Sequence, residues 1–183
     1  MRTEIRIAGF GGQGVALAGL ILGKALAIYS GYEAVMTQSY GPEARGGASS
    51  ANLVVSDEPI DYPFVLTPDI LVALSQEAYA LYRPGTKRDA ILIIDQDLVI
   101  PINSDSCYGI SSTRLAEELG RRVVTNVVMV GFFTAVTRLL TREAVERAIA
   151  DTVKPKTLPL NLKAFEVGYT QPVIPVNLRG NHE

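Results

Sequence analysis

The stretch Gly9-Phe10-Gly11-Gly12-Gln13-Gly14 has the residue types and the spacing of an anion-binding loop. The run Ile5 to Ala8 before it is typical of a strand and the run Val15 to Tyr29 after it of a helix, which is the context that such a loop requires. Glycine lets the backbone approach a ligand closely, and the free N–H groups at the start of a helix attract a phosphate. A tight strand-to-helix turn without a ligand would use the same glycines, so both interpretations stay open. The candidate ligand-binding residues of this loop are Gly9, Gly11, Gly12, Gln13 and Gly14.

A second loop, Ser39 to Ser49, follows the second expected strand. It carries Arg45, Gly46 and Gly47, and the planar guanidinium of Arg45 suits a phosphate or a carboxylate. An ion pair with Glu43 or with another chain would equally explain this arginine. In an open α/β sheet, ligands bind beyond the carboxyl ends of the strands. We expect the ends of the first two strands to lie side by side, so that both loops face one crevice.

The sequence lacks the residues that several classes of cofactor need for binding. An NAD site requires an acid at the end of the second strand, and here Glu33 lies at the start of that strand. A P-loop would need Gly-Lys followed by Ser or Thr, and no such run follows the glycines. An iron–sulfur cluster is held by about four thiolates. The chain has Cys107 alone, which we expect to be a buried, inert thiol on a strand.

Side chains for catalysis are also scarce. The only histidine, His182, lies one residue from the end of the sequence. Asp95 and Asp97 follow an expected strand, where a solvated turn is the simpler interpretation. No pair of carboxylates has a spacing that suggests acid–base catalysis. The sequence therefore predicts no catalytic residue and no metal site in this chain.

Short β-rich runs alternate with helical runs, which predicts a three-layer α/β sandwich with a mostly parallel sheet of the nucleotide-binding type. After the first strand, further strands are expected at 33–38, 51–56, 69–74 and 90–95, with a short one at 123–124. Helices are expected at 15–29, 76–82, 113–119, 127–140, 141–153 and 160–167, with Asn126 and Thr141 as N-caps. We predict a single domain over residues 1–170 and a C-terminal tail over residues 171–183.

The composition limits the partners of the chain. A formal net charge of −2 without a basic run argues against nucleic acid. The most apolar run, Val15 to Leu22, is too short to span a membrane, the N-terminus lacks the form of a signal peptide, and the lone cysteine fits a reducing compartment. We therefore expect a cytoplasmic protein. The nearly uncharged helices 15–29 and 127–136 indicate burial on more than one side. One of them is expected to contact partner chains, or a second copy when the chain is made alone.

Four stretches together resemble the gamma subunits of the 2-oxoacid:ferredoxin oxidoreductases, the pyruvate/ketoisovalerate oxidoreductase gamma family. They are Gly9 to Gly14, Ser39 to Gly47, Pro68 to Ala78, and Asn126 to Gly131 with Asn161 and Ala164 to Gly168. The glycine loop combined with the Arg-Gly-Gly run is the most specific part of this resemblance. The length and general character of the sequence are most similar to gamma subunits of the 2-oxoglutarate type. Pyruvate, branched-chain oxoacids and indolepyruvate stay open as substrates.

The resemblance implies a function for a complex rather than for the chain alone. Such enzymes convert a 2-oxoacid and coenzyme A to acyl-coenzyme A and CO₂, and they reduce ferredoxin. Thiamine diphosphate with magnesium is expected in the alpha and beta subunits, and iron–sulfur clusters in the beta and, when present, delta subunits. The gamma subunit is implied to be structural, without redox centre, and to help bind coenzyme A. Two other classes stay open: a free-standing nucleotide- or flavin-binding oxidoreductase domain, and a purely structural interaction module.

Overall fold

The computed structural model of the chain describes residues 1–39 and 47–177. Within these ranges seven strands are formed: β1 (Arg2–Phe10), β2 (Glu33–Ser39), β3 (Ala48–Ser56), β4 (Ile70–Ala73), β5 (Ile91–Asp95), β6 (Ser106–Ile110) and β7 (Pro175–Asn177). The same ranges hold the helices α1 (Val15–Ala27), α2 (Gln76–Tyr82), α3 (Ser112–Glu118), α4 (Thr125–Thr137), α5 (Arg142–Ala150) and α6 (Leu158–Tyr169). They also hold the 3₁₀ turns η3 (Arg83–Gly85), η4 (Arg122–Val124) and η5 (Pro155–Thr157).

The strands form one mixed sheet in the order β2-β3-β1-β4-β5-β6-β7. Strands β1, β4, β5 and β6 pair in parallel, whereas β3 pairs antiparallel with both β1 and β2, and β7 pairs antiparallel with β6. The predicted α/β fold is confirmed. The expectation that the ends of the first two strands lie side by side is wrong, because β3 runs between β1 and β2.

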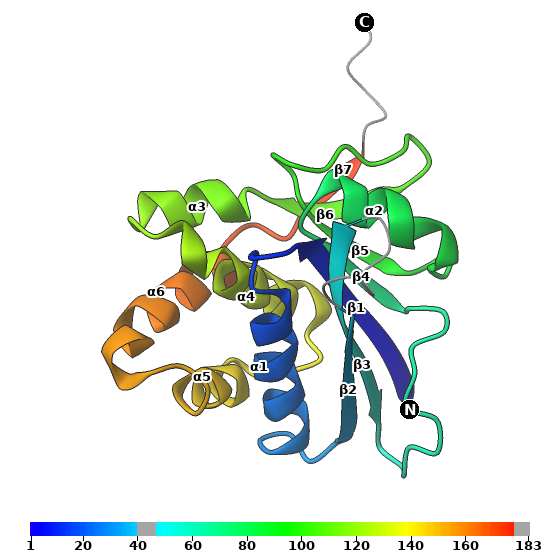
Figure 1. Cartoon of the computed structure of the whole chain (residues 1–183), viewed down its shortest axis with the longest axis horizontal. Coiled ribbons are helices and arrows are strands. Elements are labelled where there is room, and N and C mark those ends of the chain that lie inside the picture. Colours follow the sequence, from blue (N-terminus) through cyan, green and yellow to red (C-terminus); the bar gives the residue numbers. More distant parts are fainter. Residues whose placement is uncertain (40–46, 178–183) are drawn as a thin grey trace, which may run out of the picture.

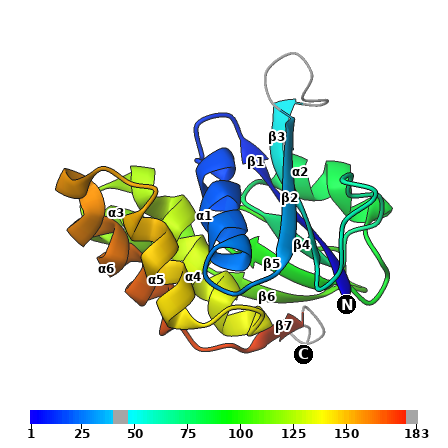
Figure 2. The same cartoon turned by 90° about the horizontal axis from the view of Figure 1, so that it is seen from below.

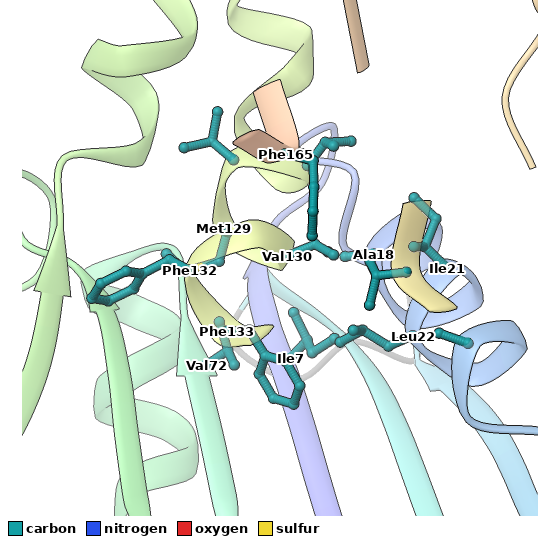
Figure 3. Packing of buried hydrophobic residues seen from close by; sticks show 14 of the residues in the cluster. Ile7, Ala18, Ile21, Leu22, Val72, Met129, Val130, Phe132, Phe133 and Phe165 are labelled. Atoms are coloured by element: carbon teal, nitrogen blue, oxygen red, sulfur yellow. The ribbon is translucent and has the colours of Figure 1, made fainter. Parts of the chain in front are cut away.

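The two faces of the sheet are covered unequally. Helices α1, α4 and α5 lie on one side of the sheet and α2 on the other (Figure 2). The larger core lies on the side of α1 and α4, where Ile7 and Val72 of the sheet pack with Leu22 and Phe133 of the helices (Figure 3). None of the helices in residues 1–39 and 47–177 combines the length and the apolar character that crossing a bilayer demands.

Helices α4 and α6 approach each other at two glycines. A Cβ built on Gly131 would collide with the carbonyl oxygen of Phe165, and one built on Gly168 would collide with the carbonyl oxygen of Val128. The two backbones are therefore in direct contact, which no residue with a side chain at these positions would permit. This contact holds α6 against α4 and so fixes the outer layer of helices on the first face of the sheet.

Three local predictions differ from the structure. Residues 123–124 belong to the turn η4 rather than to a strand, because the chain winds directly into α4. Asn126 lies inside the first turn of α4 and does not cap it, whereas Thr141 does cap α5 by accepting a hydrogen bond from Ala144 N at 3.2 Å. The segment expected to be a tail contributes β7, with Pro175 on an edge strand that tolerates its missing N–H group.

The apolar character of the two long helices has different causes. In α4, every residue from Thr125 to Thr134 is buried by the chain itself. In α1, by contrast, Leu20 is 43% exposed, and Ile28, which follows the helix, is 61% exposed. Of the two helices expected to contact partners, only α1 leaves large apolar side chains at the surface.

Candidate functional site

The glycine loop connects β1 to α1 at the carboxyl edge of the sheet (Figure 1). Its glycines are of two kinds. A Cβ on Gly9 would lie 2.5 Å from Gln13 Oε1 and 3.0 Å from Leu74 Cβ, so packing requires glycine there. A Cβ on Gly11 or Gly12 would meet no atom within 4 Å. Gly12 still needs glycine for its φ of +92°, but Gly11 has no positive φ. Nothing in the described part of the chain explains a glycine at position 11.

The side chain of Gln13 connects the ends of two strands. Its Oε1 accepts a hydrogen bond from Phe10 N at 2.6 Å, and its Nε2 donates to Leu74 O at 2.9 Å. Phe10 ends β1 and Leu74 directly follows β4, the neighbours at which the strand order reverses, where dinucleotides bind in related open sheets. Gln13 therefore bridges the two walls of that crevice. Its role is to shape the loop, and ligand space lies to either side of it.

The last glycine of the loop is held by α4. Gly14 has a φ of +72°, and a Cβ there would lie 2.5 Å from Asn126 Nδ2. The same Nδ2 donates a hydrogen bond to Gly14 O at 3.1 Å, while Asn126 Oδ1 is buried without a partner among the described residues. Asn126 thus positions the start of α1 from a helix more than a hundred residues further along the sequence.

A first cleft, which we call the strand cleft, has a volume of about 380 Å³. The glycine loop and the first turn of α1 form one wall, and the end of β2 and the start of β3 form the other, through Gln38, Ser39, Ser49 and Ser50. The amides of a glycine loop and the N-terminus of a helix favour an anion. Serine hydroxyls on the opposite wall can donate further hydrogen bonds. The strand cleft is therefore suited to a phosphate-bearing ligand.

A second cleft, the helix cleft, lies beyond Gly12 and has a volume of about 260 Å³. It is lined by Gly12, Gln13, Thr113, Arg122, Val123 and Thr125. No charged residue lines the described walls of the strand cleft, whereas Arg122 lines the helix cleft. Gly12 lines both clefts, so the tip of the glycine loop forms a ridge between them.

The structure brings part of the second predicted loop to the first. Ser39 and Ser49, at its two ends, line the strand cleft together with the glycine loop. Gly47 precedes β3 with a φ of +76°, and its missing Cβ faces open space. Arg45 and Gly46 lie outside the described residues, so their place in the site stays a prediction.

Comparison with known proteins places this architecture in a family. The sequence profile of the family described as pyruvate ferredoxin/flavodoxin oxidoreductase matches residues 4–171. The chain belongs to this family.

Relatives within the family are similar over nearly the whole chain. The 2-oxoglutarate synthase subunit KorC of Methanocaldococcus jannaschii is 51% identical over 174 residues, covering 92% of this chain and 93% of that subunit. The solved gamma subunit of a keto/oxoacid ferredoxin oxidoreductase from Geobacter sulfurreducens has 39% identity and a TM-score of 0.81, covering 91% and 96%. These similarities confirm the resemblance: the chain is a gamma-type subunit, and subunits of this kind belong to multi-subunit oxidoreductases.

A more distant structure shares the fold. The 2-oxoglutarate:ferredoxin oxidoreductase from Magnetococcus marinus, solved with 2-oxoglutarate, coenzyme A and succinyl-CoA bound, has 23% identity and a TM-score of 0.81. The match covers 91% of this chain and 30% of that one. In that enzyme the gamma-type fold is therefore one part of a longer polypeptide.

The redox groups that the family resemblance implies for the complex do not fit this subunit. Among the described residues, no three His, Cys, Asp or Glu side chains gather where they could hold a metal ion. Cys107 cannot by itself provide the thiolates of an iron–sulfur cluster. Cys107 is buried on β6, and burial raises its pKa to about 12, so the thiol stays protonated at neutral pH.

Asp95 has a different environment from the solvated turn expected for it. Its side chain is fully buried, and it accepts hydrogen bonds from Ser112 Oγ at 2.6 Å and from Thr113 N and Oγ1 at 2.9 Å. Asp95 thus anchors the N-terminus of α3 to the end of β5. Asp97 lies nearer the surface, where it accepts a hydrogen bond from Ser111 Oγ at 3.0 Å.

The site also contains residues that sequence reasoning missed. Arg122 and Thr125 line the helix cleft, although neither stood out in the sequence. The available signal was the pair of arginines at 121 and 122, a few residues before an apolar helix. The strand expected at 123–124 obscured it, because that strand would separate Arg122 from the helix, whereas the turn η4 leads directly from Arg122 into α4.

Proposed function

We propose that this chain is the gamma subunit of a 2-oxoglutarate:ferredoxin oxidoreductase and that its strand cleft binds the diphosphate of coenzyme A. The observation that carries the proposal is the open space over Gly11 and Gly12, which no other part of the described chain fills. The substrate is supported by the KorC relative, named for 2-oxoglutarate, with which the chain shares 51% identity. Coenzyme A is supported by the Magnetococcus marinus enzyme, which has the same fold and binds it.

The proposed reaction takes place across several subunits. 2-Oxoglutarate and coenzyme A give succinyl-coenzyme A and CO₂, and two electrons pass to ferredoxin with release of a proton. Thiamine diphosphate and magnesium on alpha and beta subunits would supply the decarboxylation chemistry, and iron–sulfur clusters on the beta or delta subunits would carry the electrons. This chain binds and orients coenzyme A: the amides of Gly11 and Gly12 donate to phosphate oxygens, and Ser49 and Ser50 provide hydroxyls on the opposite wall.

Arg45 is proposed to add a charged donor to the same ligand. Its position in the glycine-rich loop and the phosphate-binding geometry of guanidinium support this role. A charge-assisted hydrogen bond to phosphate is worth ~1.5–3 kcal/mol. Arg45→Ala should therefore weaken coenzyme A binding roughly 10- to 150-fold, while decarboxylation by the other subunits continues. If the complex dissociates and coenzyme A affinity is unchanged, Arg45 contacts a partner chain instead.

Gly11→Ala tests the proposal directly in the assembled complex. The added methyl group has room in this chain but would occupy the space of a bound phosphate, so the apparent affinity for coenzyme A should fall about tenfold or more, ~1.4 kcal/mol per tenfold. Steady-state kinetics with coenzyme A and 2-oxoglutarate varied separately measure this, and the KM for 2-oxoglutarate should not change. Gly85→Ala, another open glycine without a positive φ, is the matched control.

Two outcomes would favour other functions. Unchanged coenzyme A kinetics in an intact Gly11→Ala complex would indicate a structural module with an empty loop. Turnover of pyruvate in preference to 2-oxoglutarate would overturn the substrate. A free-standing dinucleotide enzyme has less support, since Gln13 bridges the crevice in which a dinucleotide would lie.

A further inference from the structure

The glycine loop separates two clefts whose described walls differ in charge. Gly12 lines both, and a Cβ on it would meet nothing within 4 Å, so the ridge between the clefts is bare backbone. One ligand with two anionic groups could therefore cross the ridge and place one group in each cleft. Coenzyme A is such a ligand, since its diphosphate and its ribose 3′-phosphate are separate groups.

Arg122 is a cation without a strong partner in the described structure. Its nearest carboxylate is that of Glu117 at 3.8 Å, and the two side chains are 69% and 53% exposed. Exposed pairs of this kind are worth little, so the guanidinium remains available to an anion. Arg122 lines the helix cleft together with Gly12 and Gln13 of the glycine loop, so a phosphate bound there would lie near it.

The walls around Arg122 are held in place. Thr125 Oγ1 donates a hydrogen bond to Arg122 O at 2.7 Å, and Thr113 on the neighbouring wall is fixed by Asp95. The next residue, Val123, is 74% exposed and offers an apolar surface beside the charge. The backbone of Arg122 is thus fixed while its side chain is free to turn towards a ligand.

We propose that the helix cleft is the subsite for the 3′-phosphate of coenzyme A, with Arg122 as its cation. This inference rests on the proposed coenzyme A function of the strand cleft. A diphosphate spreads its charge over many oxygens and suits the amides of the glycine loop. A terminal phosphate monoester carries nearly two charges at neutral pH and is matched better by a guanidinium. Among the described residues that line the two clefts, Arg122 carries the one guanidinium, so we assign the 3′-phosphate to it, with Val123 beside the ribose or the base.

Comparison of coenzyme A with 3′-dephospho-coenzyme A tests the subsite in the assembled complex. Wild type should prefer coenzyme A by roughly 10- to 100-fold in apparent affinity, the effect of one charge-assisted hydrogen bond to phosphate. Arg122→Gln should lose this preference by weakening coenzyme A alone, leaving 3′-dephospho-coenzyme A unchanged. Arg121→Gln, at the exposed neighbouring arginine that does not line the cleft, is the matched control and should keep the full preference.

The outcomes separate this inference from the function on which it rests. Equal weakening of both ligands by Arg122→Gln, or no effect on either, overturns the 3′-phosphate subsite. If Gly11→Ala weakens both ligands in the same experiments, the strand cleft still binds coenzyme A. If Gly11→Ala affects neither ligand, the proposed function itself has failed.

Discussion

At the residue scale, the glycines of the loop between β1 and α1 are under different structural constraints. Gly14 combines a φ of +72° with contact to Asn126, whereas Gly11 has neither constraint. Gly14→Ala should destabilise the chain by roughly 2–5 kcal/mol, from left-handed strain and overpacking. Gly11→Ala should change the free energy of unfolding by less than about 1 kcal/mol. Denaturant unfolding of both variants gives the comparison.

Removal of Asn126 provides the internal control. In the Gly14→Ala variant, Asn126→Ala should recover part of the lost stability, because it removes the side chain that the new methyl group meets. Additive losses would show that the contact does not determine the choice of glycine. Such distinctions could not be read from the sequence, since packing by a residue more than a hundred positions away decides them.

The buried thiol of Cys107 and the buried phenol of Tyr79 should make the folded chain less stable at alkaline pH. Burial raises the pKa of Cys107 from 9.0 to about 12, and burial together with a hydrogen bond to Asp105 raises the pKa of Tyr79 from 10.0 to about 12. Between these values the unfolded chain loses protons that the folded chain keeps. The free energy of unfolding should therefore be unaffected by these groups below pH 9 and fall as the pH rises towards about 12.

Equilibrium unfolding across that pH range measures the effect. In Cys107→Ala the free energy of unfolding should fall less steeply with pH, by the contribution of about one proton, because one of the two groups no longer titrates. An identical slope in the variant would mean that Cys107 ionises as readily in the folded chain as in the unfolded one.

At the element scale, the contact between α4 and α6 sets the position of the outer helices. Gly131→Ala should force the two backbones apart and cost ~1–3 kcal/mol or more. Thermal unfolding should show a lower Tm, and near-ultraviolet dichroism should report altered packing of the adjacent aromatic rings of Phe165 and Tyr169. The same substitution at the open Gly85 is the control. A normal Tm would mean that α6 can shift at little cost.

The elements themselves were largely accessible from the sequence, and their order was not. Runs such as Ile91 to Asp95 are dominated by β-branched residues, so the central strands and the helices between them could be predicted. No local signal shows that β3 returns between β1 and β2. The short β7 was missed because it begins with proline and depends on β6 for its hydrogen bonds.

At the scale of the whole molecule, the exposed part of α1 bears on assembly. The chain made alone should self-associate, or bind alpha and beta subunits when these are added, because Leu20 and Ile28 remain at the surface. Light scattering over a range of concentrations, with and without those subunits, measures this. A monomer at all concentrations that forms no complex on mixing would contradict the expectation.

The burial of Cys107 also makes this subunit a convenient platform for site-specific labelling. Thiol reagents attack the thiolate, and the only cysteine of the chain is inaccessible and protonated at neutral pH. The native chain should therefore not react with maleimides at neutral pH. A single Gly11→Cys substitution would place one reactive thiol in the strand cleft, which Gly11 lines. A fluorophore there could report, in the assembled complex, when the strand cleft becomes covered.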